Sequence, residues 1–394
     1  MGIDAIFNAH NWALVPFHFW SLCFFVLGCM TGSFLNVCIH RMPRDMSIVT
    51  PRSHCPHCKY SIPWYLNLPL VTWLALRGRC KNCGAPIAPR YFIVELLTGV
   101  AFLGCWLTFG RAGQPLLSLP LALVYAGFLS GLIVATFIDF EHLIIPDEIT
   151  IGGMAAGFVA SFFIPALQGA NAMNIGLRQS IIGAMAGAGT VYAILRLGKW
   201  LFGRQRVKLP VGTKIFFSET AVHLPDREIP YEELFYRQSD VIVLHAQTVE
   251  LVDRGYRDVR VRLSPSALEI SWDEMKPGEQ PFRANPDEVP CLEAVSTEIL
   301  LPREAMGLGD VKFMGGIGAF IGWQGVFFTL TVCSMIGAVF GATMVALKKQ
   351  EWSGRLYFGP FIALAAAIWI FAGQNLVDWY QHLMLSLTAV LFRQ

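Results

Sequence analysis

The stretch FIDFEHLIIPD, residues 137–147, places three carboxylates directly after a long apolar run. The run before it, LLSLPLALVYAGFLSGLIVATFI at 116–138, has the composition of a membrane helix, which needs about 20 apolar residues. Asp139, Glu141 and Asp147 follow within nine positions. A charge inside a membrane costs about 2.5–3.5 kcal/mol on insertion scales, so such residues usually serve a function. The stretch predicts a membrane helix with a functional carboxylate at its end.

Similar apolar runs recur along the chain. Of its 394 residues, 54% are hydrophobic and 15% are charged, whereas a soluble domain carries about a quarter charged residues. We predict an all-α polytopic membrane protein with about eight transmembrane helices. The expected spans are residues 17–39, 91–109, 116–138, 149–166, 175–197, 313–321, 326–347 and 358–372, and a last stretch at 376–392 either spans the membrane or lies on its surface.

Positive charge predicts the orientation of these spans. Residues 41–90 hold eight Lys or Arg and one acidic residue, and an excess of positive charge marks cytoplasmic loops. Counting spans onward puts Asp139 at the cytoplasmic face. The two runs on either side of GWQG, residues 322–325, are expected to pass out and back, with the basic residues at 348–355 marking the inside.

The segment 201–305 has a different composition. It holds 18 of the 28 acidic residues and 13 Lys or Arg. The alternating runs DVIVLH, DVRVRL and ALEISW are typical of β-strands, and PYEELFYRQ at 230–238 of a short helix. We predict a small inserted soluble domain, rich in β-structure and acidic. The expected divisions are residues 1–40 (first span), 41–90 (cytoplasmic cysteine loop), 91–200 (helices with Asp139), 201–305 (insert) and 306–394 (helices with Asp310).

Four of the ten cysteines form two C-x2-C pairs, which are Cys55 with Cys58 and Cys80 with Cys83. Two such pairs, 21 residues apart, form the pattern of a tetrahedral zinc site. The alternatives are two disulfides or a redox pair, which a reducing cytoplasmic loop disfavours. Four thiolates leave no open coordination position, so we expect a structural zinc that folds a loop with almost no apolar core.

A second carboxylate motif is GLGDVKF at 307–313, where Asp310 precedes an apolar run. Counting spans puts it at the same face as Asp139. Two close carboxylates share a proton, because both cannot easily ionise, and one then acts as base on water while the other acts as acid toward an amide. Gly307 and Gly309 would let the backbone turn and approach a substrate strand. The alternative is that both aspartates merely cap helix ends.

These stretches resemble one family, the bacterial type IV prepilin peptidases, or leader peptidase/N-methyltransferases, which are GxGD-type intramembrane aspartyl proteases. The resemblance implies that Asp139 and Asp310 are the catalytic pair, whereas Glu141 and His142 are expected to be solvated loop residues. The supporting motif residues are Asp147, Gly307, Gly309 and Lys312. The matching stretches are GSFLNVCIHRMP (32–43), LRGRCKNCGAPI (76–87), RYFIVELLTG (90–99), IDFEHLIIPD (138–147), GLGDVKFMGGIGAFIGW (307–323) and YFGPFIALA (357–365), in the family's order.

The resemblance implies a multi-pass enzyme of the bacterial inner membrane with its active site facing the cytoplasm. Such enzymes cut the short basic leader from type IV prepilins or from the pseudopilins of type II secretion. They then methylate the new N-terminal residue with S-adenosylmethionine. The implied partners are these substrates and the lipid bilayer, with no nucleic acid. No clear cofactor motif stands out, since GGIGAF at 315–320 favours helix packing; Gly78, beside the second cysteine pair, is the candidate for a cofactor contact.

Two other functional classes fit parts of the pattern. One is a zinc-stabilised transporter or channel that uses the two aspartates as a proton relay, and the other is an inactive scaffold for pilus assembly. The sequence contains no HExxH or GxSxG motif, which leaves metalloprotease and serine-protease interpretations without support. The insert at 201–305 separates the two aspartates more widely than in close relatives, and it is either a tolerated insertion or a docking module for the basic leader.

Overall fold

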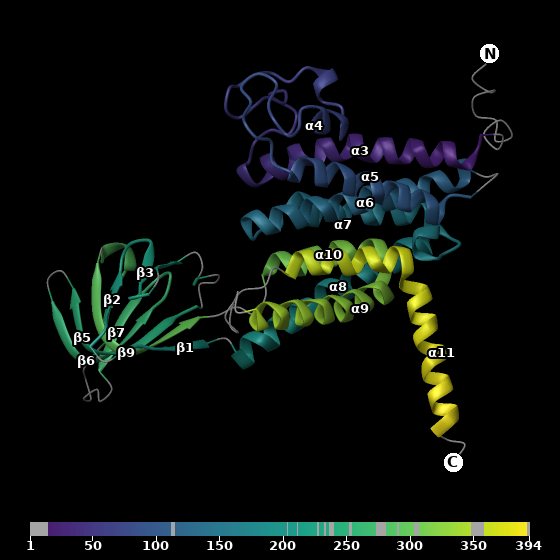
Figure 1. Cartoon of the computed structure of the whole chain (residues 1–394). Helices are drawn as coiled ribbons and strands as arrows, with labels where there is room; N and C mark the ends of the chain where they lie inside the picture. Colours follow the sequence, from purple (N-terminus) through teal and green to yellow (C-terminus); the bar gives the residue numbers. More distant parts are fainter. Residues whose placement is uncertain are drawn as a thin grey trace. The chain divides into compact units, whose positions relative to one another are not determined.

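The computed structural model divides the chain into two compact units (Figure 1). The helical unit is Met1–Tyr192 with Leu308–Gln394, and the β unit is Ala193–Gly307. The described residues are 15–111, 115–202, 204–210, 212–226, 228–231, 234–235, 240–251, 254–272, 281–289, 291–302, 307–347 and 358–391. The basic residues expected to mark the inside at 348–355 therefore lie outside the described part.

The helical unit is built from long apolar helices. They are α3 (Phe17–Arg41), α5 (Arg90–Phe109), α6 (Pro115–His142), α7 (Asp147–Phe163), α8 (Met173–Phe202), α9 (Leu308–Ala346), α10 (Phe358–Ile368) and α11 (Gln374–Leu391), with the short α4 (Val71–Ala75) in the cysteine loop. Within the described ranges, six helices are long and apolar enough to cross a membrane. This number is lower than the expected eight because α7 has only 17 residues and the runs at 313–321 and 326–347 are joined in α9.

Helix α9 is interrupted at Gly322, within the expected GWQG turn. Gly322 has φ 68° and ψ 176°, a conformation that glycine adopts without a steric penalty. Donors from neighbouring elements satisfy carbonyls just before the break: Gln168 Nε2 donates to Ala319 O at 2.8 Å, and Ser180 Oγ donates to the same oxygen at 2.6 Å. The break therefore divides α9 into a first arm, residues 308–321, and a second arm, residues 323–346.

The two arms run in opposite directions. Ile145, in the connection between α6 and α7, packs against both Gly309 at the start of the first arm and Gly359 at the start of α10. The second arm ends beside the same region, because the Phe340 ring lies 5.4 Å from that of Phe361. The first arm thus leaves this end of the helical unit and the second arm returns to it. We call it the aspartate end, since α6 also ends there.

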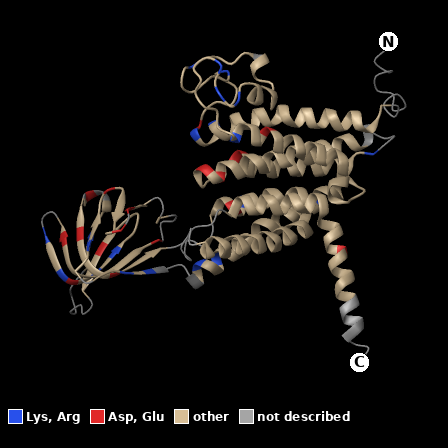
Figure 2. Ribbon diagram, viewed as in Figure 1, with Lys and Arg blue, Asp and Glu red and all other residues tan. Residues whose placement is uncertain are grey.

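Charge is distributed as expected for helices that cross a bilayer. In the helical unit, most Lys, Arg, Asp and Glu lie near helix ends or on the cysteine loop, and the middle portions of the helices carry almost none (Figure 2). Glycines allow close helix approach, as between α3 and α5, where a Cβ built on Gly28 would lie 2.7 Å from Phe102 Cβ. The helices are therefore apolar where a membrane would surround them and polar at their ends.

The described residues of the β unit form a nine-stranded antiparallel sheet. Its strands are β1 (Arg204–Lys208), β2 (Lys214–Phe217), β3 (Ala221–His223), β4 (Glu228–Pro230), β5 (Ile242–Leu251), β6 (Gly255–Leu263), β7 (Leu268–Trp272), β8 (Phe282–Ala284) and β9 (Leu292–Pro302). Their order is β4-β3-β2-β9-β5-β6-β7-β8, and β1 also pairs with β9. The strands predicted from DVIVLH, DVRVRL and ALEISW are confirmed in β5, β6 and β7. The helix expected at 230–238 falls mostly outside the described residues.

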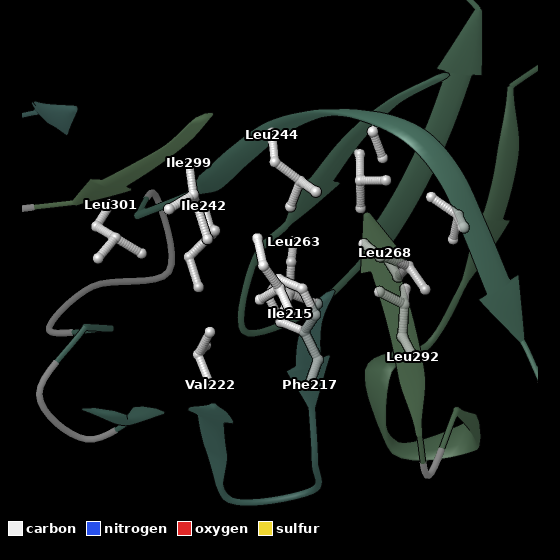
Figure 3. Packing of buried hydrophobic residues seen from close by; sticks show 14 of the residues in the cluster. Ile215, Phe217, Val222, Ile242, Leu244, Leu263, Leu268, Leu292, Ile299 and Leu301 are labelled. Atoms are coloured by element: carbon white, nitrogen blue, oxygen red, sulfur yellow. The ribbon is translucent and has the colours of Figure 1, made fainter. Parts of the chain in front are cut away.

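The β unit has its own hydrophobic core. Alternate side chains of its strands point toward one another (Figure 3), among them Ile215, Leu244 and Ile299, each at most 1% exposed. Burying one such side chain contributes about 1.5–3 kcal/mol. The chain enters and leaves the sheet through paired strands, since Arg204 on β1 faces Pro302 on β9. The unit can therefore close its core independently of the helices.

Candidate active site and metal centre

Asp139 lies in the last turn of α6 and is only 7% exposed. Its Oδ2 atom is buried and makes no hydrogen bond with any described residue. Gly359, the second residue of α10, packs directly against this oxygen, and a Cβ built there would lie 2.5 Å from it. Buried carboxyl groups are normally hydrogen-bonded, so an unpaired one indicates a functional site.

Asp310 lies in the first turn of α9 and is half-buried. The preceding Gly309 packs against Ile145, whose Cβ lies 3.8 Å from a Cβ built on this glycine. The Ile145 Cδ1 atom also lies 3.4 Å from a Cβ built on Gly359, which itself contacts Asp139. The Ile145 side chain thus contacts both Gly309, which precedes Asp310 in the sequence, and Gly359, which packs against Asp139. The fold therefore brings the two aspartate motifs to the same end of the helical unit.

Asp147 and Lys312 connect the two aspartate motifs. The Lys312 ammonium donates to both carboxylate oxygens of Asp147, at 2.7 and 2.9 Å. Asp147 is the first residue of α7, and Lys312 lies two residues after Asp310. Exposed ion pairs contribute only about 0–1 kcal/mol. The pair therefore marks the place where the starts of α7 and α9 meet and adds little to the stability of the fold. Gly307, the remaining motif residue, is exposed just before α9.

The expectation that Glu141 and His142 are solvated loop residues is correct for the solvent exposure of Glu141 and wrong for the loop. Both belong to the last turn of α6, which continues past the apolar run. Glu141 forms an ion pair with Arg90 at the start of α5. His142 is half-buried, and its Nε2 atom is buried without a hydrogen-bond partner among the described residues. The Glu141–Arg90 pair connects the end of α6 to the end of the cysteine loop. This contact could not be predicted from the spacing of the two residues in the sequence.

The four paired cysteines form one cluster, and their sulfur atoms all lie within 4.8 Å of one another. Cys55 Sγ lies 3.8 Å from Cys83 Sγ, and Cys58 Sγ lies 4.0 Å from Cys80 Sγ. A tetrahedral zinc with Zn–S bonds of about 2.3 Å separates its sulfurs by about 3.8 Å. These separations fit a four-thiolate metal site, and they are far longer than a disulfide bond of about 2.05 Å. All four cysteines are free thiols in the structure.

The two cysteine pairs are held by equivalent turns. The Cys55 N–H donates to Tyr60 O at 3.0 Å, and the Cys80 N–H donates to Ala85 O at 2.8 Å. Hydrogen bonds from the Asn82 side chain and the Tyr60 backbone lower the pKa of Cys58 to about 6. Backbone hydrogen bonds from Cys83 and Asn82 also lower the pKa of Cys80, whereas desolvation and hydrogen bonds from the neighbouring thiols raise the pKa of Cys83. Since the thiolate is the form that binds metal, the turns favour that form at Cys58 and Cys80.

Buried polar side chains attach the cysteine loop to the helical unit. Glu95, within α5 and 8% exposed, accepts a hydrogen bond from the Leu70 N–H at 2.7 Å. Arg41, 6% exposed, donates to Ser47 O at 2.8 Å and to Pro51 O at 2.7 Å. Sequence reasoning did not single out these residues. The detectable signal was an acidic residue inside the apolar stretch RYFIVELLTG.

Gly78 packs inside the cysteine loop. It is buried with φ 65°, and a Cβ built there would lie 3.0 Å from the Trp73 ring. Its N–H donates to Trp73 O at 2.9 Å. The positive φ and the close Trp73 ring explain why a glycine is needed at position 78, since a side chain would strain this tight turn and meet the ring. A role for Gly78 in cofactor binding stays a prediction from the resemblance.

An apolar cavity of about 410 Å³ lies between α6, α7 and the first arm of α9. Its walls include Gly127 and Gly131 from α6, Ile149 and Gly153 from α7, and Phe313 and Gly316 from α9. Gly127 and Gly153 have no heavy atom within 4 Å of a built Cβ, in contrast to the tightly packed Gly28. Ile149 lies two residues after Asp147, and Phe313 three after Asp310. The cavity therefore begins close to the aspartate motifs.

Comparison with known proteins assigns the chain to a family. The profile of the bacterial peptidase A24 N-terminal domain matches residues 26–109, and that of the type IV leader peptidase family matches residues 123–218 and 291–342. The prepilin leader peptidase/N-methyltransferase of Myxococcus xanthus is 41% identical over 258 residues, which cover 64% of this chain and 72% of that protein. The chain belongs to the type IV leader peptidase family. The resemblance noted from the motifs is confirmed.

Two further relatives of this type IV leader peptidase differ in coverage. The prepilin leader peptidase/N-methyltransferase of Aeromonas hydrophila is 25% identical over 394 residues, covering 93% of this chain and 95% of that protein. The type 4 prepilin-like proteins leader peptide-processing enzyme of Escherichia coli is 34% identical over 211 residues, covering 48% and 72%. No solved structure matches. The matched ranges contain the cysteine loop and both aspartates, whereas residues 219–290 of the β unit lie outside both profiles.

Proposed function

We propose that this type IV leader peptidase cleaves the leader of type IV prepilins or pseudopilins, with Asp139 and Asp310 as its catalytic pair. The observation that supports this most strongly is Asp139, which is buried, with its Oδ2 atom unpaired among the described residues, at the end of the helical unit where the Asp310 motif also lies. A proton relay in a transporter would use the same residue types. Membership of a peptidase family favours hydrolysis over transport.

The pair works as an acid and a base. With one carboxyl protonated and the other ionised, the ionised group takes a proton from water as the oxygen attacks the scissile carbonyl. The protonated group then gives its proton to the leaving amide nitrogen, and the C–N bond breaks. The proton balance is closed, since water supplies one hydroxyl to the new carboxyl and one proton to the pair. Burial of Asp139 excludes competing water and strengthens these interactions.

We also propose eight membrane passes, with the aspartate end facing the cytoplasm of the bacterial inner membrane. The two arms of α9 supply two passes, and α7, at about 26 Å, is close to the roughly 30 Å of a bilayer core. The cysteine loop carries the excess of Lys and Arg, and Glu95 and Arg90 attach it at the aspartate end. Positive charge favours the cytoplasmic side. The leader of a substrate would then meet the aspartates without crossing the membrane.

The cysteine cluster would hold a structural zinc through Cys55, Cys58, Cys80 and Cys83. The sulfur separations of 3.8 and 4.0 Å support this ligand set. We propose that the enzyme also methylates the new N-terminal amine, as the names of its relatives suggest. S-adenosylmethionine would supply an activated methyl group, and the chain would bring the amine to it. The cysteine loop is attached at the same end of the helical unit as the two aspartates. This supports the proposal that the new N-terminus moves only a short distance between cleavage and methylation.

The apolar cavity is the proposed site for the membrane segment of the substrate. It starts beside both aspartate motifs, and its open glycines on α6 and α7 would let a substrate helix approach closely. Gly127→Leu should then raise KM for a full-length prepilin about tenfold and leave the KM of a soluble leader peptide unchanged. Equal effects on both substrates would exclude this site.

A cleavage assay on a synthetic prepilin, with and without S-adenosylmethionine, tests the proposed function. Asp139→Asn and Asp310→Asn should each abolish cleavage, because Asn keeps the size and polarity of the side chain but cannot exchange a proton. Both variants should remain inserted in the membrane and keep their metal content. Near-normal turnover in either variant would refute the catalytic pair.

A further inference from the structure

The stretch YFGPFIALA carries a glycine whose role the catalytic pair does not explain. Gly359 lies in helical α10, and its φ is not among the positive values found at other glycines, so no special backbone conformation requires it. A Cβ at this position would lie 2.5 Å from Oδ2 and 3.1 Å from Cγ of Asp139. Real Cβ atoms essentially never come within 3.0 Å of another heavy atom. The Asp139 carboxyl group therefore occupies the space that any side chain at 359 would fill.

We propose that Gly359 is a positioning residue that sets the location of the Asp139 carboxyl group. This inference rests on the proposed function, in which Asp139 is catalytic. The Oδ2 atom has no partner at full hydrogen-bond geometry among the described residues, and the backbone donor that acts on the carboxyl group is the Gly359 N–H. Hydrogen bonds usually hold a catalytic carboxyl group in place. On the side of Asp139 that faces α10, packing against this helix also limits the movement of the carboxyl group. The absent side chain leaves room for the carboxyl group, and the Gly359 backbone forms the wall behind it.

The wall cannot easily retreat. Two residues further along α10, the Phe361 ring packs against Phe340 of the second arm of α9. The start of α10 also contacts Ile145, which in turn packs against Gly309 beside Asp310. Added volume at 359 would consequently displace the Asp139 carboxyl group rather than the helix. A displacement of about 1 Å at a catalytic group costs about 100-fold in rate.

The direct test is Gly359→Ala in the full-length enzyme. We expect kcat for a synthetic prepilin to fall about 100-fold, with KM for that substrate and methylation of a pre-cleaved pilin unchanged. Gly337→Ala is the matched control, because Gly337 lies on α9 facing the same helix and its built Cβ would be 3.7 Å from Phe361, an ordinary contact. Normal kcat in Gly359→Ala would overturn the proposal. If Asp139→Asn were also active, the failure would instead lie with the proposed function.

Thermal stability gives a second test that does not depend on activity. Gly359→Ala should lower the Tm of the wild-type background, since the methyl group meets the carboxyl group. It should leave the Tm of an Asp139→Ala background almost unchanged, because the opposing atoms are gone, and the two changes would then be coupled in a double-mutant cycle. If Gly359→Ala alone cannot be purified, recovery of folded protein in the Asp139→Ala background supports the proposal. An equal loss of stability in both backgrounds overturns it.

Discussion

The cysteine loop (residues 41–90) and the β unit are both polar segments between membrane helices, yet they are stabilised differently. The described part of the β unit buries 19 apolar side chains in one core. The loop has no comparable cluster among its described residues, and it leaves apolar side chains such as Val49, Val71 and Leu74 more than half exposed. It depends instead on four thiols and on contacts to α3 and α5. The loop is therefore coupled to helices α3 and α5, whereas the β unit can fold by itself.

Removing the metal ligands should produce the largest difference between the two segments. Cys55→Ser with Cys58→Ser should abolish zinc binding, because it removes two of the four thiolate ligands. The loop would then lose a contribution that is about 10–16 kcal/mol in small zinc-dependent folds. Purified wild-type protein should contain about one zinc per chain by metal analysis, and the double variant none. Methylation should decrease at least as much as cleavage, while the β unit stays protected in hydrogen exchange. Cys291→Ser, at an exposed cysteine of the β unit, is the control. Absence of zinc from wild-type protein prepared under reducing conditions would refute the metal site.

A substitution that creates a cavity in the core of the β unit should have the opposite effect: it should destabilise the β unit and leave the zinc site unchanged. Ile270 is fully buried on β7, and Ile270→Ala should destabilise the β unit by about 2–5 kcal/mol. Hydrogen exchange should show faster opening of β5, β6 and β7, while zinc content and the kcat of cleavage stay at wild-type values. Loss of zinc in this variant would mean that the two segments fold together, against the comparison.

Weakening the attachment of the loop should have an intermediate effect. Glu95→Gln keeps the shape of the side chain and an oxygen that can accept the Leu70 N–H, but it replaces a charged acceptor with a weaker neutral one, at a cost of about 1 kcal/mol. We expect faster hydrogen exchange around residues 68–76 and lower methylation, with zinc still bound. Lys59→Gln, at an exposed loop position, should change neither quantity. Unchanged exchange in Glu95→Gln would show that the charge of Glu95 does not contribute to the attachment of the loop.

Deleting the β unit should change catalysis only slightly. Because β1 and β9 are paired where the chain enters and leaves, a short Gly/Ser linker can replace residues 205–300. The segment 201–305 has 18 acidic and 13 basic residues, so any attraction of a basic leader is weak and is screened beyond about 8 Å at physiological salt. We expect KM to rise about two- to fivefold, with a flatter salt dependence and unchanged kcat. Unchanged KM and salt dependence would leave the tolerated insertion as the explanation, whereas a collapse of kcat would mean that the unit holds the GLGD segment in place.

Local patterns were sufficient to predict much of this protein. Apolar length identified the spans, period-two alternation identified β5, β6 and β7, and spacing identified the four cysteines that the fold brings together. Each of these signals is contained within a few dozen residues. The number of passes was harder to predict, because it depends on whether α9 continues or breaks at Gly322, and donors from Gln168 and Ser180, distant in sequence, contribute to that break.

Residue partners across the fold required the tertiary structure. The sequence identifies Asp139, Asp147 and Lys312 as unusual residues at the ends of apolar runs, because a charge near a membrane is costly wherever it occurs. It does not reveal that Lys312 binds Asp147, or that Asp139 lies against Gly359. Those contacts join helices separated by more than a hundred residues, and they depend on how the helices pack and not on the composition of any one helix.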